Sequence, residues 1–260
     1  MAEAKIKGVL FDLGETLLTF GKVDTLGLFK EGGQGAYAFL KTRNQPTGSL
    51  KCFLKKHLLL VQIYNLWSAI IGRDFDSAKL LRRINEKKGV VLSDEQWQEF
   101  AWCWYEPLSR LAAIENDIKE TLGRLKDAGI KLGILSNTFI NSFSLERHLE
   151  RLGILDSFDV RLYSYQFPYR KPNKRIFLAA AERLGVLPEN TVFVGDRMDT
   201  DVAGSRRANM FSVIKRAYTN SKKKIPKNII TIEKIAELPG VIESINHRKP
   251  AGSSGEDNVT

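Results

Sequence analysis

The stretch IKGVLFDLGET, residues 6–16, decides how the rest of the chain is interpreted. It opens with a short apolar run, residues 6–11, which ends at Asp12. A run of this length and composition predicts a buried β-strand, with the carboxylate of Asp12 directly after its carboxyl end. The carboxyl ends of strands are where ligands bind in open α/β sheets, so the ends of the other predicted strands become important.

Strands alternate with helices in the second half of the chain. The apolar periodicity, with glycines suited to helix ends, predicts these elements after residue 117. The predicted strands are Lys131–Leu135, Val160–Ser164, Thr191–Val194, Phe211–Ile214 and Ile229–Ile232, and the predicted helices are Ile118–Ala128, Ser144–Leu152, Lys174–Leu184 and 200–208. Such alternation predicts an α/β fold whose mostly parallel sheet is covered on both faces. Right-handed crossovers then bring the carboxyl ends of the strands to one edge.

Residues 19–114 have a different, helical character. Apolar residues recur at helical spacing in Leu50–Ile71 and in Ser77–Lys88. Ser93 with Gln96 is a capping-box signal for another helix. We interpret the three glycines between positions 32 and 35 as a flexible connection. The sequence therefore predicts an all-helical unit inserted after the first strand.

The composition excludes several classes of protein. Of the 260 residues, 43% are hydrophobic and 27% are charged, which argues against a disordered chain, a collagen or a membrane bundle. The apolar segment Leu58–Ile71 is interrupted by Gln62 and Asn65, and it is shorter than the roughly 20 apolar residues that a membrane span needs. The start of the chain lacks the long apolar segment of a secretory signal. We therefore expect a soluble, cytoplasmic protein without a membrane partner.

The net charge indicates which binding partners to expect, and the number of cysteines indicates which disulfide or zinc sites are excluded. Lysine and arginine number 40 and aspartate and glutamate 30, so the net charge of +10 favours anionic partners. The basic run 215–227 lacks interleaved aromatic residues, so we interpret it as a solvated loop and do not expect a nucleic-acid partner. Cys52 and Cys103 are too few for a disulfide framework or a zinc site of cysteines, and we expect both thiols to be buried. The sequence leaves the oligomeric state open.

Polar side chains follow several of the predicted strands and should meet at one edge of the sheet. Asp12 and Asp196 each follow a strand, and Ser136 with Asn137 follows another. Lys171 precedes a proline just ahead of a helix. Carboxylates suit Mg²⁺, while a hydroxyl and an ammonium group can bind and neutralise phosphoryl oxygens. The sequence therefore predicts a site for a divalent cation and an oxyanion, where Asp12 can attack phosphorus as a nucleophile.

Together these segments resemble the haloacid dehalogenase-like (HAD) superfamily of hydrolases. Its four motifs occur in order: DxxxT at 12–16, the strand-end Ser136, Lys171-Pro172, and GDxxxxD at 195–201. The resemblance implies a Rossmann-like core with a helical cap inserted between the first two motifs. It divides the chain into a catalytic core of residues 1–18 and 115–247, a cap of residues 19–114 and a disordered tail of residues 248–260.

The resemblance also implies a role for each motif residue, with Mg²⁺ as cofactor and a small phosphorylated metabolite as partner. The implied catalytic residues are Asp12, Thr16 and Lys171; the substrate-binding residues are Ser136, Asn137 and Lys171; and the metal ligands are Asp12, the carbonyl of Gly14, Asp196 and Asp201. Asp199 lies at the shorter spacing that some members use, so the choice between Asp199 and Asp201 stays open. The implied activity is phosphomonoester hydrolysis through an aspartyl-phosphate on Asp12.

One position departs from the DxDxT pattern of most phosphatases of this family. The second aspartate, which protonates the leaving group and later activates water, is replaced here by Gly14. Loss of such a group typically costs about 10²–10⁴ in rate. The nearest carboxylate, Glu15, is expected to point away from Asp12. The departure puts general acid–base catalysis in question.

Three alternatives to a phosphatase follow from that departure. A protein of this kind can bind phosphate and turn over poorly. The 2-haloacid dehalogenases also lack the second aspartate and attack carbon without a metal, although their fourth motif is expected to be of the Ser-Ser-Asn type. Phosphonate hydrolases lack it too and use a lysine of the cap, for which Lys51, Lys55 and Lys56 are candidates.

Aromatic residues and histidines complete the set of candidates. We expect His57 and His148 on solvated helix surfaces, and the four tryptophans in the interior of the cap. Four side chains just before Lys171 are candidates for substrate contact: Tyr165, Phe167, Tyr169 and Arg170.

Overall fold

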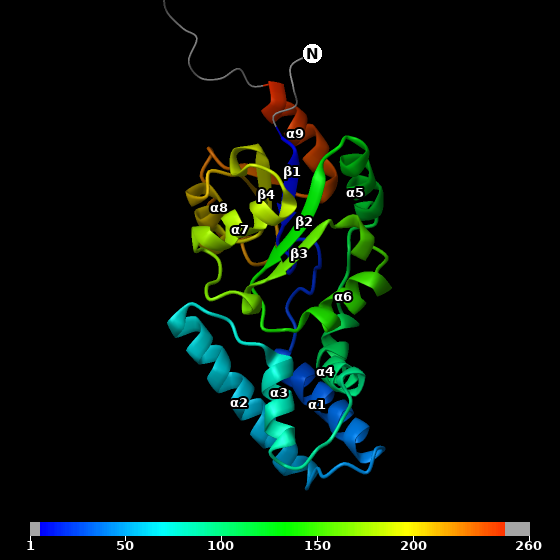
Figure 1. Cartoon of the computed structure of the whole chain (residues 1–260). Helices are drawn as coiled ribbons and strands as arrows, with labels where there is room; N and C mark the ends of the chain where they lie inside the picture. The colour runs from blue at the N-terminus through cyan, green and yellow to red at the C-terminus, as the bar shows by residue number, and fades with distance from the viewer. Residues whose placement is uncertain (1–5, 248–260) are drawn as a thin grey trace, which may run out of the picture.

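The computed structural model describes residues 6–247 and is built on a six-stranded parallel sheet (Figure 1). The strand order is β3-β2-β1-β4-β5-β6, so β1 lies inside the sheet between β2 and β4. The strands are Gly8–Phe11 (β1), Lys131–Ser136 (β2), Val160–Tyr163 (β3), Thr191–Gly195 (β4), Phe211–Lys215 (β5) and Ile230–Ile232 (β6). Phe11 pairs with Ile134 and with Val194, which aligns the carboxyl ends of β1, β2 and β4.

Helices cover both faces of the sheet, as strands that are apolar throughout require. Val9 and Phe11 pack on one face against α5, α6 and α9, whereas Leu10 and Phe193 pack on the other against α7. The bounds of the helices that follow the insertion are Ile118–Asp127 (α5), Ser142–Arg151 (α6), Lys174–Leu184 (α7), Ala203–Arg207 (α8) and Leu238–His247 (α9). This confirms the predicted Rossmann-like α/β fold. Most predicted elements match within two residues at each end, but α9 was not predicted.

Four helices that lie between β1 and α5 in the chain form a helical insertion, which lies beyond the carboxyl ends of the strands (Figure 1). Its helices are Thr25–Lys41 (α1), Leu50–Ile71 (α2), Ser77–Glu86 (α3) and Asp94–Ser109 (α4). The predicted capping box is present, because Ser93 and Gln96 each accept a backbone hydrogen bond from the other. The insertion has an apolar interior of its own, centred on Phe53, Phe100 and Trp104. Within residues 6–247, no helix combines the length and hydropathy of a membrane span.

The expected flexible connection at the three glycines is wrong, because all three lie inside α1. A Cβ atom on Gly32 would lie 2.6 Å from the carbonyl oxygen of Trp104, and one on Gly33 would lie 2.8 Å from the ring of the same residue. Helices α1 and α4 therefore approach closely where α1 has no side chains. The glycines serve packing between helices that are distant in sequence, which local turn preferences do not reveal.

Expectations for single side chains in the helices also needed correction. His57 is fully buried in the insertion, where Nδ1 contacts the Phe53 carbonyl oxygen at 2.7 Å and Nε2 contacts Asn85 Nδ2 at 2.9 Å. His148 is buried as well, with Nδ1 2.9 Å from the Tyr105 hydroxyl. Both rings are buried and hydrogen-bonded to other helical residues, His57 through both nitrogens and His148 through Nδ1, so neither histidine lies on a solvated face.

Some tryptophans and cysteines that we expected in the interior lie at the surface. Trp97 and Trp104 are buried in the interior of the insertion as predicted, whereas Trp102 is buried against the core and Trp67 is 60% exposed on α2. Cys52 is exposed and Cys103 is partly exposed, so the expectation of two buried thiols is wrong. The predicted disordered tail, residues 248–260, lies outside the described residues.

Candidate active site

The sheet brings three of the predicted residues to neighbouring positions. Asp12, Ser136 and Asp196 stand at the carboxyl ends of β1, β2 and β4, which are adjacent in the sheet. Lys171 reaches the same edge from the loop before α7. The spatial prediction from the strand ends is thus confirmed, whereas the chemical role of each residue stays a prediction.

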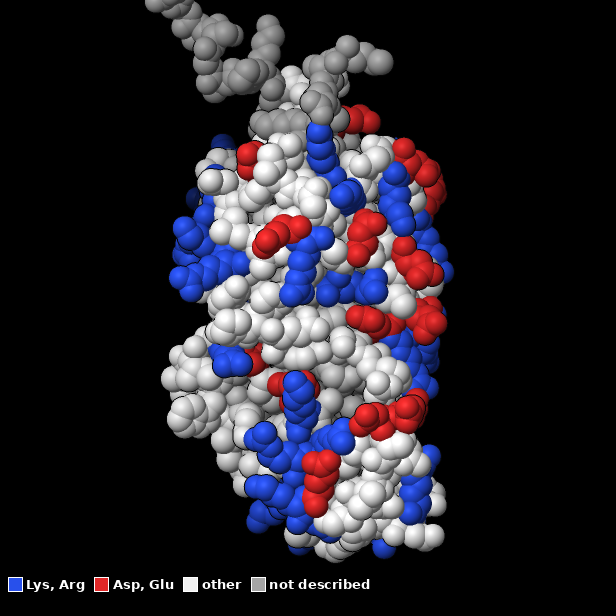
Figure 2. All heavy atoms as spheres, in the orientation of Figure 1, with Lys and Arg blue, Asp and Glu red and all other residues white. Residues whose placement is uncertain are grey.

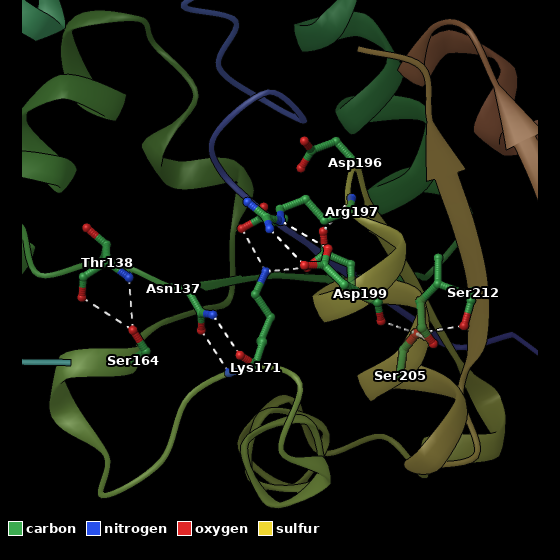
Figure 3. Close-up of polar contacts among 12 residues, drawn as sticks. Asn137, Thr138, Ser164, Lys171, Asp196, Arg197, Asp199, Ser205 and Ser212 are labelled. Carbon is green, nitrogen blue, oxygen red and sulfur yellow. Dashed lines mark hydrogen bonds and ion pairs between the residues drawn. The ribbon is translucent and has the colours of Figure 1, made fainter. Parts of the chain in front are cut away.

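Lys171 is the centre of the charged cluster (Figure 3). Its Nζ lies 2.9 Å from Asp12 Oδ1 and 2.7 Å from Asp201 Oδ1, and the side chain is 2% exposed. Burial lowers the pKa of this ammonium group, but attraction to Asp12 and Asp201 outweighs burial and leaves the pKa above its usual value. Lys171 therefore stays protonated and holds two carboxylates in place.

Three buried carboxylates surround this one ammonium group. Asp12, Asp196 and Asp201 each offer an oxygen, and these oxygens all lie within 4.8 Å of one another. Burial is the main cause that raises the pKa of all three. Repulsion adds to it, since Asp196 raises the pKa of Asp12 and Asp201 raises that of Asp196, while Lys171 opposes the shift. An excess of buried negative charge among hard oxygen donors fits a divalent cation such as Mg²⁺.

The structure separates the two alternatives in the fourth motif. Asp201 is 1% exposed, contacts Lys171 and accepts a hydrogen bond from the Arg197 backbone at 3.0 Å. Asp199 points to the surface, 58% exposed, and pairs with the Arg197 guanidinium at 2.8 Å (Figure 3). That pairing lowers the pKa of Asp199, as expected for a solvated ion pair. Asp201, not Asp199, therefore belongs to the charged cluster.

The loop after β5 supports Asp196 and was not predicted to do so. The Thr219 hydroxyl donates a hydrogen bond to the Asp196 carboxylate. Asn220 Nδ2 donates to the backbone oxygens of Asp196 at 2.8 Å and of Lys215 at 2.7 Å. Both residues belong to the run 215–227, which we interpreted as a solvated loop from its charge. Their uncharged side chains give no local signal, because the contact joins segments about 20 residues apart.

Of three other residues considered in the sequence analysis, Asn137 and Glu15 have structural hydrogen-bond partners, whereas the Thr16 hydroxyl has none among the described residues. Asn137 donates from Nδ2 to the Lys171 carbonyl at 2.9 Å and accepts from the Lys171 backbone nitrogen at 2.8 Å, so its amide fixes the Lys171 loop (Figure 3). Glu15 has a left-handed backbone, φ 58°, and its Oε1 accepts from the backbone nitrogens of residues 20 and 21. Thr16 is buried, and within residues 6–247 its hydroxyl has no hydrogen-bond partner.

A cavity of about 440 Å³ opens over the cluster. Its wall includes Ser136 and Arg170 from the sheet side and Thr25 and Tyr105 from the helical insertion. Of the four candidates before Lys171, Arg170 is the one in this wall, while Tyr165 lines a neighbouring cavity. Phe167 and Tyr169 instead pack beside α7, so the expectation that they contact substrate is not supported.

The catalytic position that departs from the family pattern has room around it. A Cβ atom built on Gly14 meets no described atom within 4 Å. The residue lines the cavity together with Asp12. The absence of the second carboxylate is therefore not imposed by steric crowding.

Comparisons of the sequence and of the fold with known proteins indicate the family of this chain. The model of the haloacid dehalogenase-like hydrolase family matches residues 6–209. The glyceraldehyde 3-phosphate phosphatase of Methanopyrus kandleri is 31% identical over 218 residues, which are 80% of this chain and 83% of the relative. That of Methanothermobacter thermautotrophicus is 32% identical over 248 residues, which are 91% and 100% of the two chains. A crystal structure of a HAD phosphatase from Thermococcus onnurineus superposes with a TM-score of 0.55 at 27% identity, covering 91% of this chain and 98% of its own.

The matched region contains the whole charged cluster and most of the sheet that positions it. Asp12 lies near its beginning and Asp201 near its end, and the helical insertion lies between them. The buried site and the family match thus concern the same residues. The chain belongs to the haloacid dehalogenase-like hydrolases.

Proposed function

We propose that this hydrolase is a Mg²⁺-dependent phosphatase of small phosphomonoesters. The observation that carries the proposal is the cluster of three buried carboxylates around Lys171 at the base of a cavity. Its excess negative charge calls for a divalent cation, and a phosphate group needs both that cation and the ammonium group to approach Asp12. The glyceraldehyde 3-phosphate phosphatases among the relatives support a small phosphorylated metabolite as substrate.

Each residue of the cluster has a distinct part in the proposed reaction. Asp12, oriented by its ion pair with Lys171, attacks phosphorus and forms an aspartyl-phosphate, which water then hydrolyses. Asp12, Asp196, the Gly14 carbonyl and the supporting Asp201 would hold Mg²⁺, which when bound offsets repulsion between Asp12 and the phosphate. Lys171 neutralises charge on the phosphoryl oxygens, and the Ser136 hydroxyl donates a hydrogen bond to one of them.

The helical insertion serves in this proposal as the cap of the site. Thr25 and Tyr105 of the insertion close the cavity from the side opposite the sheet. A wall of this kind excludes bulk water during the first transfer, which strengthens the electrostatic interactions inside. The boundaries at residues 18 and 115 then separate the catalytic core from the cap.

The glycine at position 14 limits which esters are hydrolysed well. Without an acid beside Asp12, the leaving oxygen must depart with less proton donation. Substrates with good leaving groups, such as acyl phosphates and sugar phosphates whose phosphate is on the anomeric oxygen, should therefore be hydrolysed better than simple alkyl phosphates. The same glycine favours a second candidate function, a phosphate-binding protein with little turnover.

Phosphate release from a panel of phosphomonoesters, with Mg²⁺ and with EDTA, tests the proposal. The wild type, Asp12→Asn and the matched surface variant Asp199→Asn should be compared. Release that requires Mg²⁺ and Asp12, and that Asp199→Asn retains, is the expected result. A folded protein that binds phosphate but releases none from any ester would support the binding protein instead. Release of halide in EDTA from 2-haloacids would identify a dehalogenase.

A further inference from the structure

One buried carboxylate of the helical insertion reaches into the core beside the candidate active site. Asp74 lies in the loop between α2 and α3, and its side chain is buried. Oδ1 accepts a hydrogen bond from Arg170 Nη1 at 2.7 Å, and Oδ2 accepts one from the Ser164 hydroxyl. Ser68, at the end of α2, also donates to Oδ1. Each carboxylate oxygen of Asp74 thus accepts a hydrogen bond from a different segment of the core.

Each of the two core donors is tied to a loop that carries a phosphate-binding candidate. Arg170 directly precedes Lys171 in the chain. The Ser164 hydroxyl accepts a hydrogen bond from the backbone nitrogen of Thr138 at 2.9 Å, two residues after Ser136 (Figure 3). Asp74 therefore contacts the residue before Lys171 through Oδ1, and through Oδ2 it contacts Ser164, which in turn is bonded to the Ser136 loop.

The two loops are also joined to each other, which closes a ring. The Asn137 amide makes two hydrogen bonds with the Lys171 backbone, at 2.8 and 2.9 Å. The ring thus runs from Asp74 through Arg170, Lys171, Asn137–Thr138 and Ser164 back to Asp74. Its one member from the insertion is Asp74, so the ring is complete only while the insertion is docked on the core.

Packing beside the ring supports this dependence on docking. Phe75, next to Asp74, stacks on Phe139 of the Ser136 loop with ring centroids 5.0 Å apart and planes 6° apart. The backbone nitrogen of Ser77 donates to the Phe139 carbonyl at 3.1 Å. Within residues 6–247, the ion pair of Asp74 is with Arg170 at 2.7 Å, and the hydroxyls of Ser68 and Ser164 donate its other side-chain hydrogen bonds.

We propose that Asp74 is a positioning residue that couples the docked position of the helical insertion to the geometry of the phosphate-binding loops. The proposal rests on the proposed function, because it concerns how the same site grips a phosphate group. When the insertion is docked, Asp74 holds the Lys171 and Ser136 loops at a fixed separation. When the contact is lost, Arg170 and Ser164 lose their common acceptor and the two loops move independently, so the site binds phosphate weakly.

The test is the affinity of the folded protein for inorganic phosphate, measured by calorimetry with Mg²⁺ present. Asp74→Asn should raise the Kd for phosphate at least about tenfold. The matched control is Asp76→Asn in the same loop: Asp76 caps α3 by accepting from the Lys79 backbone nitrogen, a role that asparagine can also fill. The Kd of this control should stay within about twofold of the wild type.

A double-mutant cycle separates positioning from simple loss of stability. If Asp74 acts through Arg170, the variant that combines Asp74→Asn with Arg170→Gln should bind phosphate no more weakly than the weaker of the two single variants. All measurements are made below the unfolding transition of each variant, so that only folded protein is compared. A lower melting temperature with an unchanged phosphate Kd in Asp74→Asn would overturn the proposal. Wild-type protein that binds phosphate but hydrolyses no ester would contradict the proposed function and leave this comparison of affinities valid.

Discussion

The edge of the sheet and the interior of the helical insertion treat buried polar groups in opposite ways. At the sheet edge, three buried aspartates lie close to a single ammonium group, that of Lys171, so the acidic groups outnumber the basic one. In the insertion, both ring nitrogens of the buried His57 are paired, with the Phe53 carbonyl oxygen and with Asn85 Nδ2, and burial lowers the pKa of His57 to about 4. The first arrangement calls for a cation, whereas the histidine of the second already has its partners in the folded chain.

This difference shows where electrostatic energy is stored in the molecule. Buried charges of like sign cost free energy unless a counter-charge arrives, so the sheet edge is prepared for a cation and a phosphate. A buried neutral pair costs little once its hydrogen bonds are made, so the insertion uses its polar groups for folding. Changes at the two places should therefore alter different properties.

Removal of the buried ammonium group should have the largest effect. Lys171→Met leaves the carboxylates of the sheet edge uncompensated, which typically costs about 3–5 kcal/mol of unfolding free energy. Phosphate release should also fall about 10²–10³-fold. Urea unfolding in EDTA and a phosphate assay measure both effects, with the exposed Lys174→Met as control. A variant as stable as that control would show that the edge does not store unfavourable charge.

Acid should weaken the insertion through its neutral histidine. His57 has a folded pKa of about 4 against 6.5 in the unfolded chain, so the unfolded state binds the proton more readily. The stability that this difference provides is complete above pH 6.5 and is lost as the pH falls toward 4, by about 3 kcal/mol in total. His148, lowered likewise to about 4, adds to the same trend.

Chemical unfolding between pH 4 and 7 measures this loss. His57→Gln should flatten the dependence of stability on pH, because glutamine cannot be protonated there. His247→Gln changes an exposed histidine at the end of α9 and should leave the dependence unchanged. Equal slopes for the two variants would mean that His57 is already accessible to solvent protons.

A carboxylate at position 14 should supply the proton donor that the candidate active site lacks. Gly14→Asp places a proton donor where the built Cβ meets no described atom within 4 Å, so the side chain fits. Hydrolysis of alkyl phosphates should rise by about 10²-fold, while 4-nitrophenyl phosphate, which needs little protonation, should change less. Gly14→Asn has the same shape without the acid. If both variants gave the same rates, the gain would not come from general acid catalysis.

The smallest effect expected is in the packing of the insertion. Gly32→Ala brings a methyl group against the Trp104 backbone, which should cost about 1–3 kcal/mol of unfolding free energy. Gly35→Ala, three residues along the same helix, meets only Cys103 at 3.9 Å and should stabilise by about 0.5–1 kcal/mol. Thermal unfolding of the two variants measures these effects. A higher melting temperature for both would contradict the close approach of α1 and α4 at Gly32.

The sequence was sufficient where local patterns determine structure. Helix α7 was predicted at its observed bounds from its apolar pattern and from Gly185, which takes the left-handed conformation at its end; the structure adds Asn173 as the cap of its start. Asp12, Ser136 and Asp196 were brought together by an argument about strand ends alone, because parallel strands align those ends. Periodicity, caps and strand termini are properties of a few adjacent residues, so they can be recognised without the fold.

Contacts between distant segments could not be predicted in this way. The burial of His57 depends on Asn85, 28 residues later, and the support of Asp196 depends on Thr219. Asp74 and Arg170 are 96 residues apart and belong to different elements. Nothing in either local sequence marks such a pair, since each residue type is also common on a surface. The choice of Asp201 over Asp199 likewise depends on the π-helical turn at residues 198–202, which precedes α8. From the sequence we had predicted a single helix that begins at residue 200.

The position of the helical insertion has a consequence for how the protein is made. Gly8 of β1 pairs with Lys131 of β2, which is synthesised 123 positions later. At about 5–20 residues per second, β1 leaves the ribosome roughly 6–25 s before its first neighbour in the sheet. During this interval the apolar residues of β1 have no strand to pair with, although the helices of the insertion can already fold. The nucleophile candidate Asp12, joined to that strand, is therefore synthesised well before the segments that complete its final surroundings.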